Sequence, residues 1–218
     1  MELLRRMQTL LAQLYDAPVC EDVLDFVLSD RHRLRAAVGE QAGDAADEQV
    51  YVVEEDQGVR LGLFIDRSVL ERLARRDPLQ ALDEDNLPDF CTALEGVSHF
   101  HYLVWSAARG RNVSLLELEL QAEVDKYATA VALMTRQQAG RFPEALHARL
   151  FHAVRFLPQL DEISRRRYQE ANRHAARFCR SLEERFLRAR RQRPELWLAE
   201  LRRFFRRSHQ EKIRQLAV

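Results

Sequence analysis

Hydrophobic residues near the start of the chain recur every three or four positions, which is the period of an amphipathic α-helix. Asp16 and Pro18 follow this series, and both favour a helix end at this point. The sequence therefore predicts a helix over residues 2–15. Its apolar stripe consists of Leu3, Leu4, Met7, Leu10, Leu11 and Leu14.

Two apolar strings further along the chain alternate with polar residues and carry β-branched side chains. QVYVVEE and VRLGLFID stand on either side of a short turn that contains Gly58, which is typical of a β-hairpin. We predict this hairpin over residues 49–66. The small, acidic stretch 38–48 has no period and predicts a loop, whereas the apolar group 23–28 fits either a short helix or a strand.

Helical patterns follow the hairpin almost without interruption. Ser68 and Glu71 have the spacing of a capping box at a helix start, and Ser114 and Glu117 repeat it. The string SLLELELQ from Ser114 onward alternates like a strand, but its Leu, Glu and Gln residues favour a helix. The predicted helices cover residues 68–76, 88–108, 114–136, 143–156, 159–192 and 194–216.

These elements predict a mainly helical α+β fold. Residues 1–86 form an acidic N-terminal part with the β-hairpin and short helices, and residues 87–218 form a bundle of about five helices. The bundle ends in a basic helical hairpin, because Arg193 and Pro194 separate its last two helices sharply. We expect both parts to pack as one compact unit.

The composition fits a helical protein of a reducing compartment. The 218 residues include only 7 glycines and 6 prolines, so residues that break a helix are scarce. The 3 cysteines lie far apart and form no Cys-x-x-Cys pair, which argues against a disulfide framework or a zinc ribbon. No stretch has the length and hydrophobicity of a membrane span, and no signal cleavage site follows the first helix. We therefore expect a cytoplasmic protein with no membrane contact.

The net charge of zero conceals a strong charge difference between residues 1–140 and residues 141–218. Residues 1–140 hold 14 Lys+Arg and 25 Asp+Glu, which gives −11, and residues 141–218 hold 20 and 9, which gives +11. The acidic and basic segments of such a chain either attract one another, or the basic segment binds an anionic partner.

The basic charge is concentrated on the predicted helix 159–192. Its buried stripe contains Phe178 and Phe186, and a series of arginines falls on the opposite side at about 100° per residue. Glu170 and Glu184 lie in the same arc, but the arc stays cationic even when both are paired. We call this arc the arginine ridge. It comprises Arg166, Arg173, Arg177, Arg180, Arg188 and Arg191.

The arginine ridge leads to our first functional hypothesis. A displayed cationic surface without catalytic motifs favours a non-enzymatic adaptor or regulator that binds an acidic protein surface or a second copy of this chain. Nucleic-acid binding or RNA processing is the alternative, because arginines neutralise phosphates. The acidic half of the chain and the lack of a recognition-helix or single-strand-binding motif argue against this alternative.

One short motif bears on RNA processing. Arg167 and His174 stand seven residues apart in RRRYQEANRH, a spacing that resembles the arginine–histidine motif of HEPN ribonucleases. The resemblance covers only these few residues, and it implies cleavage of RNA by the two side chains.

The string EGVSHFHYLVW, residues 95–105, contains another candidate site. On a helix, Glu95 and His99 lie one turn apart on one side, whereas His101 shares the apolar face and is expected to be a core residue. Glu123 falls on the apolar side of the next helix, where a carboxylate needs a partner. A surface pair of Glu95 with His99, and a salt bridge from Glu123 to a neighbouring arginine, are the plain interpretations. Convergence of the three as an acid–base or metal cluster of a metal-dependent enzyme is our third hypothesis.

Other chemistries have little support in the sequence. The zinc-protease string His-Glu-x-x-His is absent, and the motif from Glu144 to His147 is one Glu-x-x-His where a di-iron bundle needs two. The string that begins at Gly96 lacks the second glycine of a nucleophile elbow. Glycine-rich phosphate loops are also missing. We therefore assign no catalytic residue, no metal ligand and no cofactor from motifs.

Overall fold

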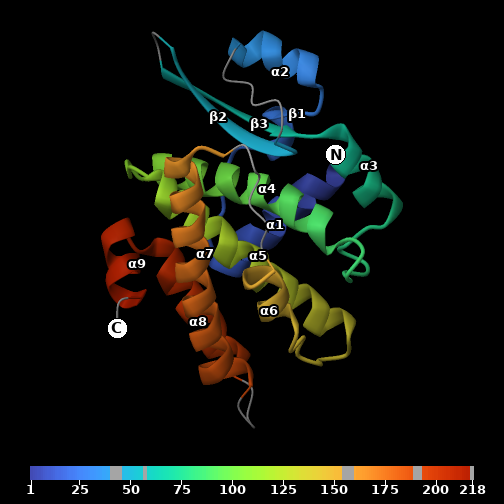
Figure 1. The fold of residues 1–218 in the computed structure, drawn as a ribbon, viewed down its shortest axis with the longest axis vertical. Helices are drawn as coiled ribbons and strands as arrows, with labels where there is room; N and C mark the ends of the chain where they lie inside the picture. Colours follow the sequence, from blue (N-terminus) through green and yellow to red (C-terminus); the bar gives the residue numbers. More distant parts are fainter. Residues whose placement is uncertain (40–45, 56–57, 154–159, 189–192, 217–218) are drawn as a thin grey trace.

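The computed structural model describes residues 1–39, 46–55, 58–153, 160–188 and 193–216 of the 218-residue chain. These residues form the expected mainly helical α+β fold, with a small sheet on one side of a helical bundle (Figure 1). Parts of the predicted elements at 38–48, 49–66, 143–156 and 159–192 lie outside the described residues.

Three described strands form one sheet in the order β1–β3–β2. β2 (Glu48–Glu55) and β3 (Gly58–Ile65) pair in antiparallel fashion and confirm the predicted hairpin. β1 (Val27–Leu28) adds to β3 in parallel, so the ambiguous stretch 23–28 ends in a short strand.

The rest of the N-terminal part consists of helical elements, of which α2 (Arg31–Val38) packs on β1. The helix at 31–38, which we did not predict, starts where Asp30 accepts hydrogen bonds from the N–H groups of His32 and Arg33. Asp66 caps the helix after the hairpin by accepting from the N–H of Ser68, so the predicted cap by Ser68 is wrong. The elements of this part are α1 (Glu2–Tyr15), the 3-10 turn η1 (Val23–Asp25), α2 (Arg31–Val38) and α3 (Arg67–Arg75).

The two faces of the sheet pack against different helices, because successive residues of a strand point to opposite sides. Phe64 and Tyr51 pack with Leu34 of α2 on the outer face. Leu63 and Ile65 join the main core on the inner face. Residues of β2 that share this inner face, Glu48 among them, are therefore directed toward the bundle.

Two long helices form the centre of the bundle. α4 (Leu87–Ala107) and α5 (Leu115–Gln137) agree with the predictions, and Ser114 caps α5 by accepting from the N–H of Glu117. α4 packs on the sheet, on α1, on α3 and on α5. Polar side chains of these two helices therefore lie inside the protein, where each needs a partner.

The C-terminal helices form the expected antiparallel hairpin (Figure 1). Phe178 stacks on Phe204 with ring centroids 4.0 Å apart, and the N–H of Arg193 donates to the carbonyl oxygen of Phe186. The two helical segments on either side of Pro194 therefore run in opposite directions. The elements are α6 (Leu146–Phe151), α7 (Glu162–Leu182), the π-helical turn η3 (Glu183–Leu187), α8 (Pro194–Arg206) and α9 (His209–Leu216).

The prediction of one continuous helix over 194–216 is wrong. Ser208 begins a new helix, because its N–H and its hydroxyl both donate to Glu211 Oε2. The string SHQE is a capping box that is visible in the sequence and that our prediction missed. α9 is therefore a separate helix, and it packs on α7.

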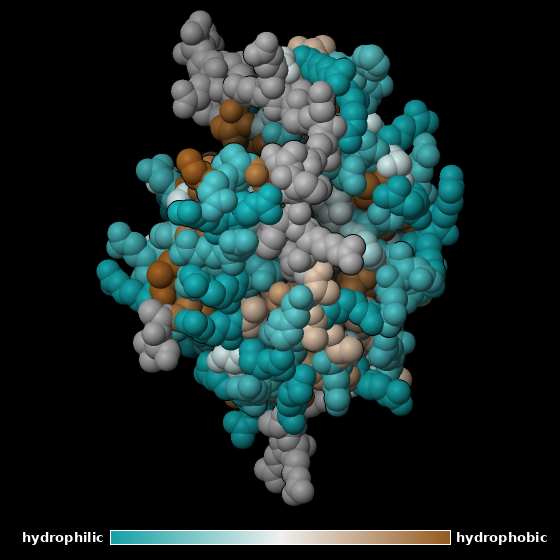
Figure 2. Space-filling model, viewed as in Figure 1, coloured by the Kyte–Doolittle hydropathy of each residue, from teal (hydrophilic) through white to brown (hydrophobic). Residues whose placement is uncertain are grey.

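The described parts of residues 1–86 and 87–218 share one hydrophobic core. Leu4 and Ile65 from the first part and Phe100 and Phe204 from the second belong to the same cluster of buried side chains. Hydrophilic residues dominate the face shown in Figure 2. Among the described helices, none combines the length and the hydrophobicity of a membrane-spanning segment.

Candidate functional site

Helix α5 carries polar residues at alternate positions in the string ELELQAEVD. Two helical steps rotate a side chain by about 200°, so alternate residues point to opposite sides of the helix. Glu117, Gln121 and Asp125 therefore face one side, and Glu119 and Glu123 face the other. Both sides are covered by other elements, which gives the protein two separate internal polar clusters.

The first cluster surrounds His99 of α4. Its Nε2 lies 3.5 Å from Glu119 Oε2 of α5, and its Nδ1 lies 3.5 Å from Glu48 Oε1 of β2. Glu95 lies one turn before His99, and Glu95, His99 and Glu119 offer ligand atoms that are all within 4.8 Å of one another. The His99 side chain is only 7% exposed. We call these four residues the glutamate–histidine cluster.

Two basic side chains border this cluster. Lys126 Nζ donates to Glu95 Oε2 and to Glu123 Oε1, each at 2.8 Å. Arg167 Nε of α7 lies 3.9 Å from Glu119 Oε1. Lys126 thus contacts one oxygen of Glu95, and Arg167 contacts one oxygen of Glu119. Neither contact uses the second oxygen of the carboxylate.

Burial and nearby charges shift the pKa values of the cluster in opposite directions. Burial raises the pKa of the Glu48 carboxyl. Burial by itself lowers the pKa of the His99 imidazole, but Glu119 and Glu48 outweigh it and hold that pKa well above its ordinary value. The pKa of Glu95 is lowered, because the charges of Lys126 and His99 outweigh the effect of its burial. Such shifts cluster at functional sites, and buried structural ion-pair networks produce them as well.

Two buried atoms of the cluster, Glu48 Oε1 and His99 Nε2, have no hydrogen-bond partner among the described residues. The 3.5 Å contacts of His99 exceed the roughly 2.7–3.2 Å of an N–H···O hydrogen bond. Two ligand atoms, each about 2.1 Å from one tetrahedral metal ion, are about 3.4 Å apart. The separation of His99 Nε2 from Glu119 Oε2 matches that of two ligands of one ion, and it is also the separation of the ion pair between Nδ1 and Glu48 Oε1.

Gly96 allows the sheet to approach α4 at this site. A Cβ at this position would lie 2.6 Å from Leu63 Cδ1 and 2.8 Å from Glu48 Cγ, and both distances are shorter than real Cβ contacts. The missing side chain therefore leaves the space through which Glu48 reaches His99.

We expect the Gly96→Ala variant to have a free energy of unfolding about 1–2 kcal/mol lower than the wild type. Crowding of Leu63 and Glu48 outweighs the roughly 1 kcal/mol by which alanine favours a helix over glycine. Urea denaturation measures the difference. Gly62→Ala is the control, because a Cβ at Gly62 meets nothing within 4 Å. A Gly96→Ala protein as stable as the wild type would contradict the close approach of Glu48.

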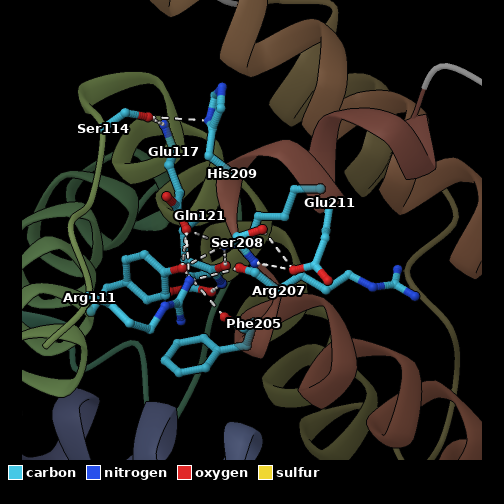
Figure 3. A network of polar contacts seen from close by, with 12 residues as sticks. Arg111, Ser114, Glu117, Gln121, Phe205, Arg207, Ser208, His209 and Glu211 are labelled. Atoms are coloured by element: carbon cyan, nitrogen blue, oxygen red, sulfur yellow. Dashed lines mark hydrogen bonds and ion pairs between the residues drawn. The ribbon is translucent and has the colours of Figure 1, made fainter. Parts of the chain in front are cut away.

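The second cluster holds α9 against α4 and α5 (Figure 3). Lys212 of α9 is fully buried, and its Nζ donates to the Tyr102 hydroxyl at 2.8 Å and to Gln121 Oε1 at 2.9 Å. Glu117 accepts hydrogen bonds from Tyr102 and from Arg111. Burial lowers the pKa of the Lys212 ammonium to about 7.

Asp125 extends the second cluster toward α1. Its carboxylate accepts from the Tyr15 hydroxyl at 2.5 Å, from the Ser98 hydroxyl at 2.6 Å and from the Gln121 amide at 2.6 Å. Burial raises the pKa of the Asp125 carboxyl to about 6. Because these donors satisfy both carboxylate oxygens, we assign the second cluster a structural role.

Of the three polar residues that the sequence suggested, the structure groups Glu95 and His99, but their third member is Glu119. Glu123 is linked to Glu95 only through the ammonium of Lys126. Glu95 and His99 do not form a surface pair, since both side chains are largely buried between α4, α5 and the sheet. Glu123 binds Lys126 on its own helix and not an arginine from a neighbouring one. Both plain interpretations are therefore wrong.

Part of the arginine ridge is bound within the protein. Arg180 and Arg188 both contact Glu183, at 2.8 and 3.0 Å, and the Glu183 side chain is fully buried. Tyr127 also donates a hydrogen bond to this carboxylate, at 2.8 Å. These two arginines therefore neutralise a buried carboxylate of their own segment, and the hydrogen bond from Tyr127 of α5 ties that carboxylate to the bundle.

The other arginines of the ridge differ in their surroundings. Arg166 pairs with a carboxylate one turn before it, and Arg177 donates to a backbone carbonyl at the end of α9. Arg173 is exposed. Arg191 lies outside the described residues.

The remaining residues of interest lie in different environments. His101 is in the core, as expected, and burial lowers its pKa to about 4. Arg167 and His174, the pair with HEPN-like spacing, make different contacts. Arg167 borders the glutamate–histidine cluster, whereas His174 Nε2 lies 3.5 Å from Glu170.

Comparisons with protein-family models, with curated proteins and with solved structures find no match to this chain. The glutamate–histidine cluster is therefore interpreted from its own geometry, burial and charge.

Proposed function

We propose that this protein binds one divalent transition-metal ion through Glu95, His99 and Glu119. One observation carries the proposal: the buried His99 Nε2 has no hydrogen-bond partner among the described residues and lies 3.5 Å from a Glu119 oxygen. A buried polar atom without a partner is destabilising by about 1–3 kcal/mol. Ligation of a metal ion by this nitrogen removes that cost. The proposal modifies the third hypothesis from the sequence, because Glu119 takes the place of Glu123 among the ligands.

The surroundings of the proposed ligands support metal binding. Glu48 faces Nδ1 of His99, so an N–H on that nitrogen leaves Nε2 free to ligate. Lys126 binds Glu95, and an arginine of α7 lies beside Glu119. Metal ligands in proteins commonly have such outer partners, which orient them and tune their basicity.

The charges around the site also favour a dication. Four carboxylates and two basic side chains meet there, namely Glu48, Glu95, Glu119, Glu123, Lys126 and Arg167. His99 must be neutral to ligate a metal ion, and in that state the charges of −4 and +2 leave −2. One divalent ion neutralises this charge, and buried charges need such compensation.

The ligand set restricts the kind of ion. One imidazole and two carboxylates suit Mn²⁺, Fe²⁺, Co²⁺ or Zn²⁺. Mg²⁺ and Ca²⁺ prefer oxygen ligands throughout, and Mg²⁺ gives up its water reluctantly. Three protein ligands leave a coordination position for water, as in catalytic zinc sites, which suits Lewis-acid or hydrolytic chemistry.

Calorimetric titration of chelator-treated protein with Mn²⁺ and with Zn²⁺ tests this proposal. We expect one ion per chain for the wild type. His99→Gln and Glu119→Gln should each lower the metal affinity about 100-fold, because each removes a ligand. Loss of an outer partner of a ligand already lowers metal affinity by about 10–100-fold. Glu162→Gln, on the exposed start of α7, is the matched control and should bind like the wild type.

A protonated His99 between Glu48 and Glu119 is the competing explanation of the same geometry. An imidazolium can bridge two carboxylates without any metal ion. In that case neither ion binds the wild type, and the three variants give the same flat titrations. This result would refute the proposed function.

Binding of an acidic partner or of nucleic acid through the arginine ridge stays a prediction. The contacts of Arg180 and Arg188 with Glu183 reduce the positive charge that the ridge offers to a partner. Arg173 remains the exposed residue whose substitution best tests such binding. The buried, incompletely bonded His99 is a more specific feature, and we therefore place metal binding first.

A further inference from the structure

The ammonium group of Lys126 lies between two carboxylates next to the glutamate–histidine cluster. Its Nζ is 2.8 Å from Glu95 Oε2 and 2.8 Å from Glu123 Oε1, and the side chain is only 12% exposed. Burial raises the pKa of the nearby Cys91 thiol to about 12, and the charge of Lys126 opposes this rise. Two carboxylates thus bind one buried ammonium, with a thiol close by.

Glu95 connects this ammonium to the proposed metal ion. One of its oxygens accepts a hydrogen bond from Lys126, and its carboxylate is also one of the three grouped ligands with His99 and Glu119. A carboxylate that contacts two cations is the bridging arrangement of two-metal sites, in which the ions are about 3.5–4 Å apart. The cluster therefore has the carboxylates of a two-cation site.

We propose that the Lys126 ammonium is the resident second cation of this carboxylate-bridged pair and limits the protein to one metal ion. The inference rests on the proposed function. It adds the number of metal ions bound per chain and the residue that determines this number. An ammonium group supplies a positive charge and three N–H donors. It donates hydrogen bonds to Glu95 and Glu123 and, unlike a free metal ion, cannot dissociate into solvent, because it is covalently part of α5.

Displacement of Lys126 by a free metal ion is unfavourable. The ion would have to separate the ammonium from both carboxylates, and the lysine would then be a buried charge without a partner. Removal of one partner from a buried ion pair is strongly destabilising. The wild-type protein therefore takes up only the ion at His99.

The Lys126→Ala variant tests the inference. It removes the ammonium and leaves Glu95 and Glu123 free to ligate, so titration with Mn²⁺ should give two ions per chain where the wild type gives one. Electron paramagnetic resonance should show spin coupling between the two Mn²⁺ ions, because they share Glu95. Lys126→Arg keeps the positive charge and should bind one ion. Lys126→Ala combined with Glu123→Gln removes a ligand of the second ion and should also bind one.

The outcomes separate this inference from the proposed function. A wild type that binds no ion refutes the proposed function and this inference with it. A wild type and a Lys126→Ala variant that both bind one ion refute the inference alone. Lys126→Ser, whose hydroxyl can donate to one carboxylate, replaces the alanine variant if the latter shows no cooperative unfolding. Failure of both variants to bind a second ion overturns the inference.

Discussion

The Asp125→Ala variant is expected to lose about 3–5 kcal/mol of its free energy of unfolding. Asp125 is fully enclosed and accepts hydrogen bonds from Tyr15, Ser98 and Gln121, which belong to three different helices. Alanine leaves three buried donors without an acceptor, and each unsatisfied group costs about 1–3 kcal/mol, partly relieved by rearrangement. The loss should exceed that of a typical surface substitution, which is about 0.5 kcal/mol or less.

Urea denaturation at neutral pH measures this loss. Asp125→Asn is the matched control, because it keeps the size of the side chain and one carbonyl acceptor. The Tyr15 and Ser98 hydroxyls can also rotate to accept from its amide. We therefore expect the asparagine variant to lose about 1–2 kcal/mol. A loss below 1 kcal/mol for Asp125→Ala would show that the second cluster does not join the three helices as described.

The free energy of unfolding is expected to contain a contribution from Lys212 that rises by about 3–4 kcal/mol between pH 7 and pH 10. Burial lowers the folded-state pKa of Lys212 to about 7, whereas an exposed lysine titrates near 10.5. Over this range the unfolded chain holds a proton that the folded protein has released, so stability increases with pH at up to about 1.4 kcal/mol per unit. Below pH 7 both states hold the proton and the contribution is constant.

The groups around Lys212 explain why its pKa is lowered. The Tyr102 hydroxyl and Gln121 Oε1 are neutral partners, and the ring of Phe204 lies 5.1 Å from Nζ. Glu117 is the nearest carboxylate, at 3.7 Å, and it is shared with Arg111. The carboxylates nearby therefore compensate the buried ammonium only in part.

Comparison of the wild type with Lys212→Met isolates the Lys212 contribution. Methionine has a similar length and no charge, so the other titrating groups contribute equally to both proteins. The difference in the free energy of unfolding between the two proteins, measured by urea denaturation at several pH values, should change by about 3–4 kcal/mol from pH 7 to pH 10. Parallel pH profiles of the two proteins would mean that Lys212 is not desolvated.

Much of the fold is predictable from the sequence because its elements have clear local patterns. Alternation around a glycine turn predicts the hairpin, and Ser114 predicts the start of α5. The break between α8 and α9 also has a local cause, the capping box from Ser208 to Glu211, but the apolar pattern continues across it. The parallel pairing of β1 with β3 has no local pattern, because it depends on tertiary contacts.

The candidate site is predictable only in part. Helical geometry places Glu95 next to His99, and it separates Glu119 and Glu123 from the other polar residues of α5. Glu48 could not be identified, because it comes from a strand far away in sequence and reaches His99 only through the gap that Gly96 leaves. Burial of Glu95 and His99 depends on how the sheet covers α4, and the sequence of α4 alone does not contain that information.

The most direct test of the metal site is a crystal structure of the protein grown with Mn²⁺, with anomalous scattering recorded from the metal. We predict one anomalous peak within the protein, about 2.0–2.2 Å from His99 Nε2 and from one oxygen each of Glu95 and Glu119. Glu48 should face Nδ1, and Lys126 should remain bound to Glu95 and Glu123. The absence of a peak at His99, with an imidazole hydrogen-bonded to Glu48 and Glu119, would contradict the account.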